Sequence, residues 1–162
     1  MFNKKYTPNQ ALQKIKHYCS YQERCHSEVA SKLYSFGLRK TEVEETISTL
    51  IEEDYLNEER FVTQFAGGKF RVKQWGKTRI KYELKQKKIS EYLIKKALKS
   101  IDNEDYIVTL KKLTNTKWLE LKQEQYLIRI TKTTNFLLQR GFEPELIKAT
   151  IAEIRSKSDD KN

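Results

Sequence analysis

The chain has 162 residues, of which 38% are hydrophobic and 33% are charged, with only five glycines and two prolines. So few helix-breaking residues favour long helices over a strand-and-turn architecture. Two cysteines are too few for a disulfide framework, and no apolar run approaches the roughly 20 residues that span a bilayer. The composition therefore predicts a helical, cytoplasmic protein that has no membrane partner.

The positive charge is concentrated in one part of the chain. The formal net charge is +10, and residues 69–100 hold 12 Lys and Arg against 2 Asp and Glu. Residues 1–68 hold 9 against 10, and residues 101–162 hold 11 against 10. A cationic surface that is localised in this way implies an acidic or polyanionic partner.

Helix start signals occur along the whole chain. Thr7 before Pro8 is typical of an N-cap followed by proline in the first turn. Thr41 and Glu44 have the spacing of a capping box, and Ser90 precedes apolar residues spaced by three and four. These signals predict nine helices, over residues 8–21, 26–36, 41–53, 58–73, 76–87, 90–101, 103–118, 122–140 and 144–156.

An apolar pattern recurs three times, with members at positions 0, +4, +5, +10, +14 and +17. The copies begin at Leu33, Leu84 and Leu137. The second position is glycine in two copies, where a helix would end in a left-handed residue. Amphipathic periodicity alone does not explain the shared break. The pattern predicts an all-α fold of three tandem three-helix repeats, over residues 1–57, 58–101 and 102–156, followed by a frayed tail over 157–162.

The most specific residues lie where the first repeat meets the second. The run reads Asp54-Tyr55-Leu56-Asn57-Glu58-Glu59-Arg60-Phe61, followed by Lys69-Phe70-Arg71, Trp75-Gly76-Lys77, Glu83-Leu84-Lys85 and Ile89-Ser90. This pattern resembles the RecX family, which comprises bacterial regulators of the RecA recombinase, and the resemblance covers residues 11–101 well. It implies an elongated, curved array of three repeats without catalysis or a cofactor. It also implies binding to the RecA–DNA filament and inhibition of its recombinase, ATPase and coprotease activities.

The basic middle segment is the candidate surface for the filament or for DNA. Lys77, Lys81, Lys85 and Lys88 fall on one stripe of a helix, where neighbouring cations repel one another. Phosphates would relieve that repulsion and release counterions, whereas a merely solvated helix face is the alternative. The predicted binding residues are Lys69, Arg71, Lys73, Lys77, Arg79, Lys81, Lys85 and Lys88.

Three further residues near this segment are candidates for partner contact. Arg60 lies at the start of a helix that Asn57 can cap, where the helix dipole does not favour a cation. Phe70 and Trp75 are interleaved with the cations and could stack on bases or on partner residues. The alternatives are a structural role between repeats for Arg60 and a place in the core for the two aromatic side chains.

No constellation of residues indicates a catalytic or metal site. His17, Cys19, Cys25 and His26 are close in the sequence but lack the spacing of a zinc site and an accompanying catalytic acid. We therefore expect a monomeric binding protein without metal or cofactor. The resemblance to the RecX family implies that its partners are the RecA filament and DNA, the latter bound without sequence specificity. Two other functions stay open, namely a helical protein that acts on DNA alone and a repeat scaffold that docks an acidic protein.

Overall fold

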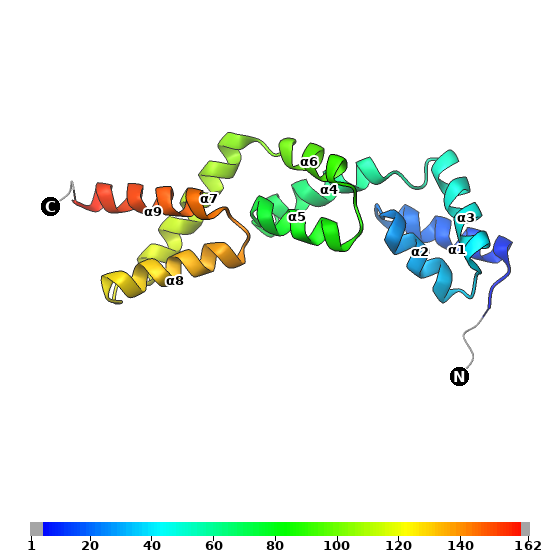
Figure 1. The fold of residues 1–162 in the computed structure, drawn as a ribbon, viewed down its shortest axis with the longest axis horizontal. Helices are drawn as coiled ribbons and strands as arrows, with labels where there is room; N and C mark the ends of the chain where they lie inside the picture. The colour runs from blue at the N-terminus through cyan, green and yellow to red at the C-terminus, as the bar shows by residue number, and fades with distance from the viewer. Residues whose placement is uncertain (1–4, 160–162) are drawn as a thin grey trace. The chain divides into compact units, whose positions relative to one another are not determined.

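The computed structural model describes residues 5–159 (Figure 1), and this part of the chain consists of nine helices without a strand. The predicted all-α fold is thereby confirmed. None of the described helices combines the length and the apolar character that a membrane span requires. The helices are α1 (Pro8–Tyr21), α2 (His26–Ser35), α3 (Lys40–Glu52), α4 (Glu58–Arg71), α5 (Lys77–Gln86), α6 (Glu91–Lys99), α7 (Asn103–Glu120), α8 (Tyr126–Gln139) and α9 (Pro144–Asp159).

Most helix boundaries lie within two residues of the predicted ones, and three differences bear on the predictions made from the sequence. The capping box expected at Thr41 was wrong, because α3 begins at Lys40 and the Arg39 amide donates to Glu42 Oε1 at 2.9 Å. Helix α8 begins at Tyr126, four residues late. Helix α9 continues to Asp159, through the start of the expected frayed tail, and residues 160–162 lie outside the described part.

The chain divides into two compact units. The first unit comprises the residues up to Phe65 together with Leu84–Lys95, and the second comprises Ala66–Glu83 together with the residues from Lys96 onward. The division passes through α4, α5 and α6, so the three-repeat organisation stays a prediction. In the first unit, α1, α2 and α3 pack on one another. Their shared core contains Ala11, Ile15, Val29, Leu33, Val43, Leu50 and Leu56.

In the second unit, α7, α8 and α9 pack on one another around an aromatic centre. Tyr106 is fully buried, and its ring centroid lies 5.7 Å from that of Phe70 and 5.3 Å from that of Phe142. Leu110, Leu137 and Ile147 are also fully buried. This core joins the end of α4 to the three C-terminal helices.

The recurring helix break has the same backbone geometry in all three copies. Gly37, Lys88 and Gly141 have φ angles of 90°, 63° and 94°. In each copy, the backbone amide of the residue after the left-handed one donates to the carbonyl of the leucine that begins the pattern. The N–O distances are 3.4 Å for Leu38 to Leu33, 3.2 Å for Ile89 to Leu84 and 3.2 Å for Phe142 to Leu137. These contacts satisfy carbonyls that a helix end would otherwise leave without partners.

Lys88 adopts the left-handed conformation although it carries a Cβ, which costs about 1 kcal/mol or more. We therefore expect Lys88→Gly to raise the free energy of unfolding by about 1 kcal/mol, measured by urea denaturation. Lys88→Ala keeps the Cβ and removes the same charge, so it is the matched control and should bring no such gain. Equal stability of the two variants would contradict this account.

Candidate nucleic-acid interface

Six of the predicted binding residues lie in the second unit, along the end of α4 and the start of α5. We call them the α4–α5 cationic surface: Lys69, Arg71, Lys73, Lys77, Arg79 and Lys81. Arg71, Lys73 and Lys81 are exposed, and the other three are half-buried. The remaining two predicted residues, Lys85 and Lys88, belong to the first unit, where Lys85 Nζ lies 4.0 Å from Glu91 Oε1.

The start of α5 is held by three consecutive backbone amides. The Gly76 amide donates to the Arg140 carbonyl at 2.7 Å, and the Thr78 amide donates to the Gly141 carbonyl at 3.0 Å. Between them, the Lys77 amide donates to the Tyr106 hydroxyl at 3.0 Å. Exposed amides at a helix N-terminus commonly bind anions, but these three are occupied. An anion at this surface would therefore be bound by side chains.

Two glycines make this close approach possible. A Cβ on Gly76 would lie 2.3 Å from the Gly141 carbonyl carbon, and a Cβ on Gly141 would lie 2.2 Å from Arg79 Cβ. Both distances are far inside van der Waals contact, so any side chain would separate α5 from the connection between α8 and α9. The requirement for glycine at position 76 thus comes from backbone packing.

Tyr106 connects the start of α5 to the start of α9. Its buried hydroxyl accepts the hydrogen bond from the Lys77 amide and donates one to Glu143 Oε1. Burial raises the pKa of Tyr106 far above its ordinary value, and the hydrogen bond to Glu143 raises that pKa further. The sequence alone does not reveal this pair. The apolar spacing of Tyr106 and Leu110 on α7 marks Tyr106 as a core residue but does not reveal what its hydroxyl contacts.

Most of the charge on the α4–α5 cationic surface is not neutralised by carboxylates of the described residues. In the described part of the chain, no carboxylate lies within 4.0 Å of Arg71, Lys73, Lys77, Arg79 or Lys81 as a salt-bridge partner. Glu83 is the one acidic residue in the sequence from 66 to 83. The positive potential over this surface is therefore available to a partner.

The two aromatic candidates have different environments. Phe70 is buried against Tyr106, which agrees with the alternative that placed it in the core. Trp75 is half-buried, and the Arg79 guanidinium lies 4.1 Å from its ring centroid, with Lys69 Nζ at 5.0 Å. A cation over an indole ring gains electrostatic attraction. Trp75 therefore helps to hold Lys69 and Arg79 in place.

Arg60 lies in the first unit and makes several contacts inside the protein. Its Nε donates to Glu23 Oε1 at 2.5 Å, and its Nη1 and Nη2 donate to the side chain and the carbonyl of Asp54 at 3.1 Å each. The hydrogen bond to Glu23 raises the pKa of the guanidinium. Asn57 Oδ1 accepts from the Arg60 amide at 2.9 Å, as expected for the helix cap. The contacts of Arg60 thus connect the start of α4 to the preceding turn.

The cysteines and histidines are not arranged for nucleophilic chemistry. Cys19 and Cys25 are buried, and burial raises the pKa of both thiols, which disfavours the reactive thiolate. His26 Nδ1 lies 3.5 Å from Glu58 Oε2.

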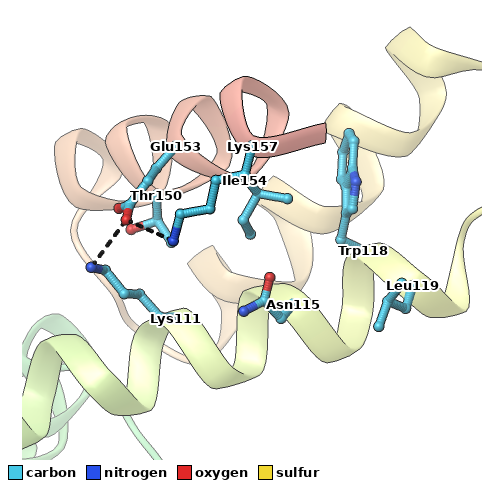
Figure 2. Close-up of a pocket in the computed structure, with 8 residues that line it drawn as sticks. All are labelled: Lys111, Asn115, Trp118, Leu119, Thr150, Glu153, Ile154 and Lys157. Atoms are coloured by element: carbon cyan, nitrogen blue, oxygen red, sulfur yellow. Dashed lines mark ion pairs between the residues drawn. The ribbon is translucent and has the colours of Figure 1, made fainter. Parts of the chain in front are cut away.

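A depression lies between α7 and α9 in the second unit (Figure 2). It encloses about 300 Å³, and Trp118 lies at one end of it. Glu153 pairs with Lys111 of α7 at 3.3 Å and with Lys157 of its own helix at 3.5 Å, and the pairing with Lys111 lowers the pKa of Glu153. Because its cations are already paired, this depression lacks the open positive charge of the α4–α5 cationic surface.

Tyr106→Phe should leave the Lys77 amide and the Glu143 carboxylate without their partner, at a cost of about 1 to 3 kcal/mol of unfolding free energy near neutral pH. The sign of its pH dependence follows from the raised pKa. The folded protein binds the Tyr106 proton more tightly than the unfolded chain, whose ordinary tyrosine pKa is 10.0. This contribution is complete below that pKa and declines as the pH rises above it.

The measurement is urea denaturation of both proteins at about pH 8 and about pH 11, on either side of the ordinary tyrosine pKa. The stability gap between wild type and Tyr106→Phe should shrink at the higher pH. Tyr92→Phe, which changes a 72% exposed tyrosine, serves as the control. If the difference in unfolding free energy between wild type and Tyr106→Phe stays constant with pH, the buried hydroxyl is not the cause of that difference.

Comparison with known proteins supports one family. Residues 57–98 match the family model for the second three-helix domain of RecX. The chain is 27% identical to the regulatory protein RecX of Bacillus cytotoxicus, over 88% of this chain and 53% of the relative. It is 29% identical to the regulatory protein RecX of Lactobacillus johnsonii, and the alignment covers 93% of this chain and 56% of the relative. The chain thus spans about half the length of the curated relatives it matches.

Solved structures share the fold. The crystal structure of RecX from Lactobacillus salivarius superimposes with a TM-score of 0.83 at 23% identity, over 91% of this chain and 96% of that one. A second crystal structure, of a regulatory protein RecX, superimposes with a TM-score of 0.81 at 21% identity, over 90% of this chain and 71% of that one. Through the matching helical domain and the relatives along most of its length, this chain is similar to the RecX family of regulatory proteins.

Proposed function

We propose that this chain binds the RecA–DNA filament in the cytoplasm, as a monomer, and inhibits the recombinase, ATPase and coprotease activities of RecA. Through this inhibition it would modulate DNA repair and recombination. The observation that carries the proposal is the α4–α5 cationic surface, five of whose six cations form no salt bridge within the described chain. The names of the curated relatives, which are regulatory proteins, agree with this proposal.

The physical basis of binding would be the exchange of counterions for cationic side chains. Each phosphate that a lysine or arginine neutralises releases condensed counterions, so affinity falls steeply with salt. Such contacts position a protein on nucleic acid without reading its sequence. A filament of protein on DNA offers phosphates next to protein surface, so the cations would supply the nucleic-acid part of a composite contact.

The effect on RecA can be measured through its DNA-dependent ATPase. The assay uses substoichiometric amounts of this chain, at a salt concentration where its binding to bare DNA is already lost. Wild type should inhibit under these conditions. The variant Arg71→Glu, Lys73→Glu, Lys81→Glu should lose most of the inhibition, because it reverses three exposed cations of the surface. Lys77 is left unchanged because its Nζ lies 4.9 Å from the Tyr106 ring centroid.

A matched control reverses three other exposed lysines of the second unit, namely Lys112, Lys122 and Lys148. The net charge changes equally, so only the position of the charge differs between the two variants. Undiminished inhibition by the Arg71, Lys73, Lys81 variant, with unchanged helicity, would overturn the proposal. Inhibition that requires saturation of the DNA would indicate a protein that acts on DNA alone. Absence of inhibition by wild type would favour a scaffold for an acidic protein.

A further inference from the structure

We propose that Arg140, at the C-terminal end of α8, extends the α4–α5 cationic surface and forms with Arg79 a site for the phosphates of a nucleic-acid strand. The inference deepens the proposed function and rests on it. Arg140 lies in a part of the sequence whose charges are nearly balanced, so neither composition nor spacing marks it. Its place in the fold identifies it.

Arg140 is held against the segment that joins α4 to α5. Its Nη1 donates to the Lys73 carbonyl at 2.9 Å, although the two residues are 67 positions apart. Its own carbonyl accepts from the Gly76 amide at 2.7 Å. The guanidinium also lies 4.9 Å from the ring centroid of Phe136. These contacts attach both the backbone and the side chain of Arg140 to the cationic segment.

Arg79 approaches the same place from the first turn of α5. Its Nη1 donates to the Gln139 carbonyl at 3.4 Å, and its guanidinium lies over Trp75. Its Cβ lies beside Gly141, where the two backbones meet without an intervening side chain. Arg79 therefore contacts the residues on both sides of Arg140, and the two guanidiniums belong to adjoining backbone segments.

Both guanidiniums retain capacity for an anion. A guanidinium has five N–H donors, and the contacts described use one from each arginine. Neither arginine has a carboxylate partner among the side chains that the structure describes. The carbonyl and aromatic contacts restrict their motion, so less side-chain entropy is lost when an anion binds. Two such cations without a counter-charge repel each other, and an anion placed between them removes that repulsion.

The charge pattern favours a nucleic-acid strand over an acidic protein. Arginine binds phosphate through paired N–H donors, and a strand presents phosphates at short, regular intervals. The cations continue from this site through Lys73, Arg71 and Lys69 without an acidic residue between them. An unbroken row of cations matches a polyanion, while protein carboxylates usually alternate with other groups. The Trp75 ring lies within the same row.

The test is binding of a fluorescein-labelled oligothymidylate to the full chain, followed by fluorescence anisotropy at several salt concentrations. Arg140→Gln should weaken binding on the order of tenfold. It should also reduce the slope of log affinity against log salt by about 0.7, the value for one phosphate contact on a single strand. Arg140→Lys should keep the slope and lose affinity, because it retains the charge without the paired donors.

Two further variants separate this site from general electrostatics. Lys148→Gln removes one exposed charge from α9 and should leave the slope nearly unchanged. Arg79→Gln should weaken binding and reduce the slope as Arg140→Gln does. The double variant should lose less binding free energy than the two single variants lose together. Urea denaturation identifies any variant whose loss reflects unfolding, and the Arg79 variant tests the same site if Arg140→Gln is unstable.

The outcomes distinguish this inference from the proposed function. Equal slopes for Arg140→Gln and Lys148→Gln, with binding still weakened by Arg71→Glu, Lys73→Glu, Lys81→Glu, would overturn the Arg140 site alone. If none of these variants alters either oligothymidylate binding or RecA inhibition, the proposed function fails as well. Stronger binding of poly-glutamate than of oligothymidylate, with the same dependence on Arg140, would assign the site to an acidic protein.

Discussion

The first turn of α5 meets the connection between α8 and α9 with no side chain between them, and the arrangement of the second unit depends on that contact. Gly76 and Gly141 bring the two backbones close enough for the Gly76 amide to reach the Arg140 carbonyl at 2.7 Å. The contact fixes where α5 begins and the direction in which its first turn presents Lys77 and Arg79. It also keeps Arg140 beside residues that precede it by more than sixty positions.

The same contact determines how the surface can bind an anion. A helix start with exposed amides would offer backbone donors and the positive end of a dipole. Here Tyr106 and two carbonyls occupy those donors, so lysine and arginine side chains carry the available charge. Burial and the hydrogen bond to Glu143 raise the pKa of Tyr106, so its hydroxyl keeps the proton that it donates. The buried hydrogen bonds of this junction are thus distinct from the cationic side chains at the surface.

Local features of the sequence predicted much of the fold. Caps at Thr7, Asn57 and Ser90 form as expected, and the left-handed break at Lys88 follows from its register with two glycines. The error at α3 is instructive, since Arg39 with Glu42 has the same spacing as Thr41 with Glu44. The spacing of three residues does not tell which pair lies at the start of the helix. The glutamate accepts its hydrogen bond from the backbone amide of the N-cap residue, and every residue except proline has such an amide.

The parts that could not be predicted depend on contacts between distant residues. The position of the basic segment was evident from charge alone, but the sequence does not show that Phe70 is buried against Tyr106. Nor does it show that Arg140 contacts the Lys73 carbonyl. The spacing of apolar residues indicates which face of a helix is buried, but it does not indicate which residues of other helices pack against that face. The location of the candidate site in the chain therefore stays a prediction, and the contacts that support it could not be read from the sequence.

The glycine contact has a consequence for the genetics of this protein. Gly76 and Gly141 carry no charge and are buried, yet a methyl group at either would move α5 away from the connection that holds Arg140. A genetic selection for variants with defective binding would then recover substitutions of these glycines as well as substitutions of the basic residues. The glycine-to-alanine variants would keep the isoelectric point of the wild type. Measurements of helicity would distinguish such alleles from folding defects, since the proposed interface predicts a displaced charge on a protein that is still folded.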